Sequence, residues 1–270
     1  MTFMEKLSAA VRKNDSLVCV GLDPAMGKLP ACLRGRKDAI LEFNRRIVDA
    51  TRDLVCAYKP QAAYYAGQDC DEALKETIRY IRENAPDVPV ILDVKRGDIG
   101  STAEYYAKEA FERYQADAVT VNPYMGFDAV KPFLDFADKG VIILCRTSNA
   151  HSGDLQDLVA DGRPLYEHVA LLVRDKWNSS GNAALVVGAT YPEELKKLRQ
   201  LCPDMPFLVP GVGAQGGDVE KVVRYGCRAD RAGVIINSSR GIIYASGDED
   251  FAAAAGRAAR QLRDQINACR

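Results

Sequence analysis

A cluster of charged residues ends one of the apolar runs of this 270-residue chain. The segment VILDVKRGDIG (90–100) begins with three aliphatic residues and then gathers Asp93, Lys95, Arg96 and Asp98. Removing a charge from water is costly unless the charge is paired, so the cluster predicts either a structural ion-pair network or a working site. A lysine held between carboxylates stays protonated, and it can then act as an acid.

A second lysine, Lys59, ends the preceding apolar run. Residues i and i+2 of a strand lie on one face, so we expect Asp93 and Lys95 to point the same way. Lys59 would reach them from the neighbouring strand, and Asp98 would follow in the loop. A lone Asp-x-Lys pair favours the structural alternative. The additional lysine and carboxylate favour a functional site, because perturbed charge clusters in clefts often mark such sites.

A glycine-rich segment, PGVGAQGG (210–217), predicts a phosphate site. Gly211, Gly213 and Gly216 have the spacing of a dinucleotide fingerprint, but that fingerprint follows the first strand of a βαβ unit, whereas this segment follows the seventh apolar run. In barrels, the loops after strands seven and eight commonly bind phosphate. Arg240, after the eighth run, would donate two hydrogen bonds to the phosphate oxygens. The alternative is a tight turn with a surface arginine.

For two further segments, a functional and a structural interpretation are equally supported. Asp23, in GLDP, would either accept hydrogen bonds from ligand hydroxyls or cap the next turn. Ser148, in RTSN, would either contact the edge of a heterocycle or cap its loop. Neither residue decides a function by itself.

Eight apolar runs alternate with amphipathic segments along the chain. The runs are 16–23, 54–60, 88–95, 117–122, 140–147, 183–190, 206–211 and 231–238. This alternation predicts βαβ units and a parallel sheet. We expect a single (β/α)8 barrel domain over residues 1–270, with a doubly wound sheet as the alternative. Each run ends in polar residues, and only a barrel gathers all eight carboxyl ends on one face.

Composition indicates a cytoplasmic protein with no nucleic-acid or membrane partner. The chain has 36 basic and 37 acidic residues and a net charge of -1. No apolar run approaches the roughly 20 residues that span a membrane, and residues 1–16 predict an amphipathic helix rather than a signal peptide. With eight cysteines in no C-x-x-C pair and two histidines, we expect reduced thiols and no zinc site.

Several segments together resemble the orotidine 5'-phosphate decarboxylase family. They are DVKRGDIGST (93–102), PGVGAQGG, GLDP and YKPQ, and they extend the resemblance from Asp23 to Arg240. KRGDIGST and GATYPEEL are similar to the longer bacterial branch of that family. D-x-K-x-x-D alone is shared with related sugar-phosphate enzymes, whereas its combination with the glycine loop is specific.

The resemblance implies decarboxylation of orotidine 5'-monophosphate to UMP, the last step of de novo pyrimidine synthesis, with neither metal nor organic cofactor. It implies a homodimer with shared active sites. The charged tetrad would comprise Lys59, Asp93, Lys95 and Asp98, and Lys95 would protonate the ring carbanion left by the loss of carbon dioxide.

The resemblance also assigns residues to the substrate. Asp98, Ile99 and Thr102 would come from the partner subunit, Asp23 would hold the ribose and Ser148 would contact the pyrimidine. The phosphate side would comprise Pro210, Gly213, Gln215, Gly217 and Arg240. The alternative function is that of a magnesium-dependent sugar-phosphate decarboxylase or synthase, which needs an extra carboxylate for the metal. A non-catalytic phosphate-binding barrel is a third alternative.

Overall fold

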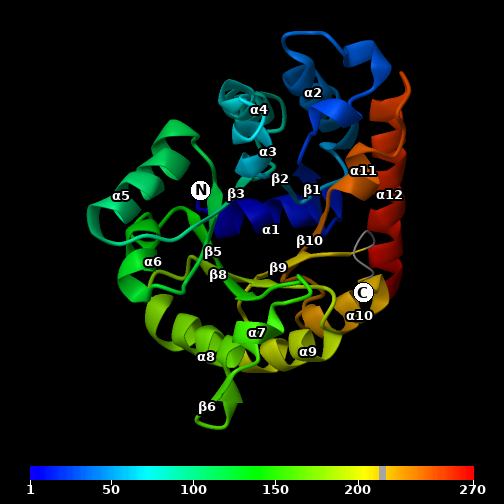
Figure 1. Ribbon diagram of the computed structural model, residues 1–270. Coiled ribbons are helices and arrows are strands. Elements are labelled where there is room, and N and C mark those ends of the chain that lie inside the picture. Colours follow the sequence, from blue (N-terminus) through cyan, green and yellow to red (C-terminus); the bar gives the residue numbers. More distant parts are fainter. Residues whose placement is uncertain (213–216) are drawn as a thin grey trace.

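The eight strands of the main sheet close into a barrel in the computed structural model, which describes residues 1–212 and 217–270. All pair in parallel, in the order β2-β1-β10-β9-β8-β5-β4-β3, and helices surround them (Figure 1). Parallel bridges from Tyr58 to Val90 and from Gln61 to Asp93 join β2 to β3, the two ends of this order. The predicted (β/α)8 barrel is confirmed.

Each predicted apolar run coincides with one barrel strand, and only β3 extends beyond its run, by one residue at Arg96. The strands are β1 (Val18–Leu22), β2 (Ala57–Pro60), β3 (Ile91–Arg96), β4 (Ala118–Val121), β5 (Gly140–Arg146), β8 (Ala183–Val187), β9 (Phe207–Pro210) and β10 (Val234–Ser238). Several runs begin before their strand because apolar residues ahead of the strand, such as Leu17, Val55 and Val88, are also buried. Burial in the barrel core therefore extends beyond the hydrogen-bonded ladder.

Helices connect the strands along the chain. They are α1 (Phe3–Asn14), α2 (Ala39–Thr51), α3 (Ala62–Ala66), α4 (Asp71–Asn84), α5 (Gly100–Lys108), α6 (Phe127–Leu134), α7 (Gly153–Gln156), α8 (Leu165–Leu172), α9 (Pro192–Leu201), α10 (Val219–Gly226), α11 (Arg240–Ile243) and α12 (Phe251–Cys269). The 148–164 segment carries α7 and a short hairpin, β6 (Val159–Ala160) with β7 (Arg163–Pro164), which projects beyond α8 (Figure 1). Over the described part of the chain, no helix is long and apolar enough to cross a membrane.

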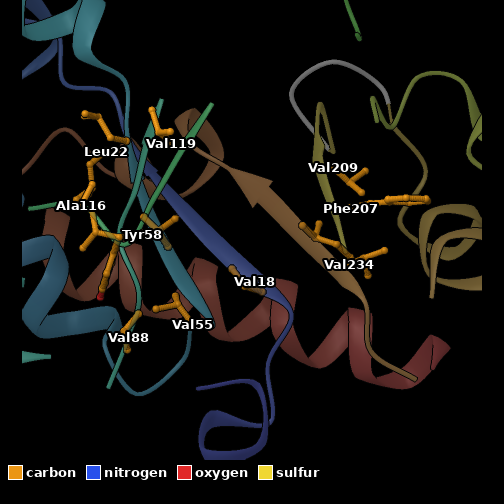
Figure 2. Packing of buried hydrophobic residues seen from close by; sticks show 14 of the residues in the cluster. Val18, Leu22, Val55, Tyr58, Val88, Ala116, Val119, Phe207, Val209 and Val234 are labelled. Carbon is orange, nitrogen blue, oxygen red and sulfur yellow. The ribbon is translucent and has the colours of Figure 1, made fainter. Parts of the chain in front are cut away.

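Strand residues pack alternately on the two faces of the barrel wall, as the two-residue period of a strand requires. Outward-facing residues pack against the helices, and Figure 2 shows Val18, Tyr58, Val119, Phe207 and Val234 among them. Inward-facing residues form an apolar floor of Cys19, Ala57, Ile91, Ala118, Ile142, Ala184, Leu208 and Ile235. Phe3 and Leu7 of α1 pack against this floor, so α1 covers the amino-terminal end of the barrel (Figure 1).

The same period decides what lines the carboxyl end of the barrel. Two residues beyond four members of the floor lie Lys59, Asp93, Thr120 and Asn237. All four side chains are buried. A polar layer therefore lies directly above the apolar floor, on the face where barrel enzymes carry their active sites.

Candidate active site

Lys59, Asp93 and Lys95 form an ion-paired triad in this polar layer. Lys59 Nζ lies 2.8 Å from Asp93 Oδ2, and Lys95 Nζ lies 2.6 Å from Asp93 Oδ1. Lys59 and Asp93 are buried, whereas the Lys95 side chain is 45% exposed. One carboxylate therefore holds two ammonium groups, and one of the two is accessible from the mouth of the barrel.

The triad keeps its buried members charged. Burial by itself raises the pKa of Asp93, but Lys59 and Lys95 more than offset this effect and hold that pKa well below its ordinary range. Burial likewise lowers the pKa of Lys59, but Asp93 and the nearby Asp23 more than offset it, so the pKa of Lys59 is raised. The site therefore holds a carboxylate and a buried cation at neutral pH.

Thr120 of β4 completes the surroundings of Asp93. Its hydroxyl donates to Asp93 Oδ1 at 2.8 Å and accepts the backbone N–H groups of Val94 and Lys95, both at 3.0 Å. We did not predict this residue, because a threonine inside an apolar run is an ordinary strand residue. Its only signal is its spacing of two from Ala118, which places it on the inward face.

Lys95 reaches Asp93 through an irregularity in β3 rather than through a regular pleat. The pairing of β3 with β4 shifts register between Leu92 and Arg96, and Lys95 has a φ of 48°, in the left-handed region. Such a conformation costs a non-glycine residue about 1–3 kcal/mol and persists only where the surroundings hold it. The register shift turns Lys95 over Asp93, which a bulge beside an active site commonly does.

Arg96, the other cation of the opening segment, points out of the site. It pairs with Glu109 at 3.0 Å and lies over the ring of Tyr106 at 4.5 Å. Both partners lie on the helical segment that follows β3. The charge cluster in the sequence therefore divides into an inward triad and an outward structural pair.

Asp98, Ile99 and Thr102 lie apart from the triad. Asp98 Oδ1 accepts the N–H of Ile99 at 2.8 Å, and within the described ranges it forms no ion pair with a lysine. Ile99 is 53% exposed, and Thr102 is also exposed. A single chain therefore brings together three of the four predicted charged residues.

Asp23 follows β1 and has an unpaired acceptor. Its Oδ1 atom is buried and has no hydrogen-bond partner in residues 1–212 and 217–270. In the same ranges, no backbone N–H donates to this carboxylate, so the capping alternative gains no support. Buried acceptors are normally satisfied, and an unsatisfied one at a barrel mouth indicates a place for a ligand donor.

Hydrogen bonds from Gln156 and Arg146 fix the backbone next to Ser148. Gln156 of α7 accepts the Thr147 N–H at 2.9 Å and donates to the Thr147 hydroxyl at 2.8 Å. Arg146, buried at the end of β5, donates to Gln156 at 3.3 Å and to Ser152 at 2.9 Å. The segment after β5 is therefore tied back to the strand that carries it.

Aromatic stacking on Arg146 and close packing against Ser148 also hold the segment after β5 in place. The guanidinium of Arg146 lies 3.8 Å from the ring centroid of Tyr191. A Cβ on Gly188 would lie 2.8 Å from the Cβ of Ser148, so only glycine leaves room there. Ser148 is half-buried, and its contact with a ring stays a prediction.

The predicted phosphate loops follow neighbouring strands. Pro210, which ends β9, is in register with Asn237 of β10. Arg240 begins α11 directly after β10, and it is exposed. Gly213 and Gln215 lie outside the described residues.

Glycine is required at both ends of the 211–217 segment. Gly211 has a φ of 98°. The Gly217 N–H donates to the Gly211 carbonyl at 3.2 Å. A Cβ on Gly217 would lie 2.7 Å from that carbonyl and 2.6 Å from the Cβ of Ala189. Gly211 therefore allows a left-handed backbone conformation, and Gly217 allows a close approach to the backbone of Gly211.

A cavity of about 1200 Å³ lies at the opposite end of the barrel, beside α1 and the loops that precede β8, β9 and β10. None of the predicted site residues in the described ranges lines it. In the same ranges, no group of three or more His, Cys, Asp or Glu side chains is placed to hold a metal ion.

The sequence matches a known family over most of its length. Residues 16–255 match the family described as orotidine 5'-phosphate decarboxylase / HUMPS. The chain belongs to the orotidine 5'-phosphate decarboxylase family. It is 63% identical over 267 residues to the orotidine 5'-phosphate decarboxylase of Ralstonia pickettii (strain 12J), covering 99% of this chain and 98% of that protein. It is 57% identical over 272 residues to the protein of the same name from Cellvibrio japonicus (strain Ueda107), covering both chains completely.

Solved structures of orotidine 5'-phosphate decarboxylase family members have the same fold. The Leishmania donovani OMP decarboxylase has a TM-score of 0.86 and 40% identity, with 100% of this chain and 98% of that chain covered. The Leishmania donovani UMP synthase has a TM-score of 0.88 and 42% identity, and this chain spans 56% of its length. The family expected from the sequence motifs is confirmed.

Proposed function

We propose that the chain decarboxylates orotidine 5'-monophosphate to UMP, with Lys95 as the acid. The observation that carries the proposal is the Asp93 carboxylate held between Lys59 and Lys95, at 2.8 and 2.6 Å. Relatives that bear the decarboxylase name at 57 to 63% identity over the whole chain support the choice of reaction.

In the proposed reaction, the bond between the pyrimidine ring and its carboxylate breaks, and the electron pair stays on the ring carbon as carbon dioxide leaves. The Lys95 ammonium stabilises that charge and then gives a proton to the same carbon. Solvent returns the proton to the lysine, because its side chain is 45% exposed. Asp93 keeps Lys95 in place, and its fixed negative charge faces the departing carboxylate.

Contacts along the substrate would divide among the barrel loops. Asp23 would hold the ribose, and Ser148 would contact the pyrimidine. The phosphate side is proposed to comprise Pro210, Gly213, Gln215, Gly217 and Arg240. Binding the remote phosphate would supply energy that orients the ring over Lys95.

We also propose a homodimer in which Asp98, Ile99 and Thr102 complete the partner's site. The segments after β3 and β4, which include Ile99, carry several exposed large apolar side chains, and patches of such side chains mark interaction surfaces. These side chains are Ile99, Tyr105, Tyr124, Met125 and Phe127. Mixing an Asp98→Asn chain with a Lys95→Ala chain should restore activity, because each mixed dimer would hold one intact site. No recovery above the separate variants would argue against a shared site.

The first test is the ultraviolet absorbance of orotidine 5'-monophosphate mixed with the purified protein, with and without EDTA. We expect an absorbance decay at the same rate in both samples. A decay abolished by EDTA and restored by magnesium would instead favour metal-dependent chemistry. No decay with this substrate, together with magnesium-dependent turnover of a sugar phosphate, would overturn the proposed function.

A further inference from the structure

Asn237 has an unpaired amide at the inner wall of the barrel. It is 8% exposed, and its Oδ1 atom has no hydrogen-bond partner within the described ranges. It lies two residues beyond Ile235 of the apolar floor, so it faces inward in the same polar layer as Lys59 and Asp93. A buried amide oxygen without a donor is costly, and this one faces the proposed substrate site.

Two further unpaired atoms lie at the ends of neighbouring strands. Asp23 Oδ1 and Ser239 Oγ are also buried without a partner in the described part of the chain. They follow the neighbouring strands β1 and β10, whose register pairs Asn237 with Cys19. A Cβ on Gly21 would lie 3.2 Å from both Asp23 Oδ2 and Ser239 Oγ. A Cβ at Gly21 would also lie 2.7 Å from the Ser239 Cβ, so glycine is what lets Asp23 and Ser239 approach each other closely at the ends of β1 and β10.

The chemistry of this cluster selects its ligand. The Asp23 carboxylate only accepts hydrogen bonds and repels a phosphate, whereas the Asn237 amide has an acceptor oxygen and an NH2 donor, so together they suit a neutral hydroxyl group, which both donates and accepts. Ser239 can donate or accept. Of the parts of a nucleotide, only the sugar presents adjacent hydroxyl groups.

We propose that Asn237 is a substrate-binding residue whose side-chain oxygen accepts a hydrogen bond from a ribose hydroxyl, beside Asp23. This inference rests on the proposed function and adds a residue that the sequence motifs did not indicate. Its position next to Pro210 in the β9–β10 register places it between the proposed phosphate and ribose contacts.

The test pairs a change in the protein with a change in the substrate. Asn237→Leu removes the acceptor at similar size, and the 2'-deoxy and 3'-deoxy forms of orotidine 5'-monophosphate remove one donor each. We expect each single change at the contacted hydroxyl to lower kcat/KM about three- to tenfold, the range for one neutral hydrogen bond. The variant acting on the deoxy substrate should have a kcat/KM only slightly lower than either single change gives.

Other outcomes separate the alternatives. If the protein and substrate losses multiply for both deoxy substrates, Asn237 acts only on structure or binds only water, and the inference is wrong. If Asn237→Leu does not fold, Asn237→Ala enters the same comparison, because it only removes atoms. Failure of the unchanged protein to decarboxylate the full substrate overturns the proposed function along with this inference, whereas multiplied losses in an active enzyme overturn this inference alone.

Discussion

The Thr120 hydroxyl on β4 donates a hydrogen bond to Asp93 Oδ1 on β3 at 2.8 Å, and the same carboxylate oxygen accepts a hydrogen bond from Lys95 Nζ at 2.6 Å. Thr120 also accepts two backbone N–H groups where β3 departs from regular pairing. One hydroxyl therefore holds both the carboxylate and the left-handed backbone of the proposed acid. The consequences of this arrangement can be measured.

Thr120→Val should lower kcat about tenfold with a smaller effect on KM, because it removes one hydrogen bond to Asp93 and two to the backbone at Lys95. Thr120→Ser is the matched control, since it keeps the hydroxyl, and it should retain most of the activity. Steady-state kinetics with orotidine 5'-monophosphate would check both variants. Equal losses in the two variants would show that packing rather than the hydroxyl matters.

Lys95→Ala should keep the fold and lose at least about a hundredfold in kcat, because the proposed proton donor is gone. Its side chain is 45% exposed, so its removal leaves no large buried cavity. Circular dichroism would check the fold, and substrate absorbance would check turnover. Near-normal turnover would contradict the role given to Lys95.

Asp93→Asn should weaken the acid sensitivity of the free energy of unfolding. The pKa of Asp93 is lower in the native state than its unfolded value of about 3.9, so its pairing stabilises the protein above that value. This stabilisation is lost as pH falls from about 5 toward the native pKa, by up to about 1.4 kcal/mol per pH unit.

Denaturant unfolding of both proteins at several values between pH 6 and pH 3 would measure this difference. The variant should be less stable at pH 6, because Lys59 is left buried without its partner, and its stability should fall less steeply in acid. Parallel curves for the two proteins would show that Asp93 does not carry the acid dependence.

Gln156→Leu should raise KM several-fold with little loss of thermal stability, because it frees the Thr147 backbone that leads into Ser148. Asp157→Asn is the matched control. Asp157 also contacts the buried Arg146, at 3.3 Å, but it does not bond the Thr147 backbone, and an asparagine there keeps an acceptor oxygen of the same size. Equal KM values for Gln156→Leu and the unchanged protein would show that α7 does not orient the site.

Much of the architecture was predictable because local patterns carry it. Seven of the eight strands lie within predicted apolar runs and β3 extends one residue beyond its run, since neighbouring residues carry the alternation of buried strands and amphipathic helices. Lys59, Asp93 and Lys95 were predicted together because each lies at the end of its strand. The contacts of Arg146 with Ser152, Gln156 and Tyr191 were not predicted, because these residues lie on the one-turn helix α7 and just before α7 and α9, where no repeating pattern marks them.

The amino-acid sequence by itself determined the barrel and the charges at its mouth, because strand period and strand ends are local properties. Only the tertiary structure decided which polar residues face those charges. Thr120 looks like an ordinary strand residue in the chain, and it contacts Asp93 because β4 pairs with β3. Asn237 is one of the polar residues at the strand ends, and only the folded barrel shows that its side-chain oxygen has no partner in the described residues. The left-handed turn at Lys95 likewise depends on a hydroxyl from another strand, which no local pattern specifies.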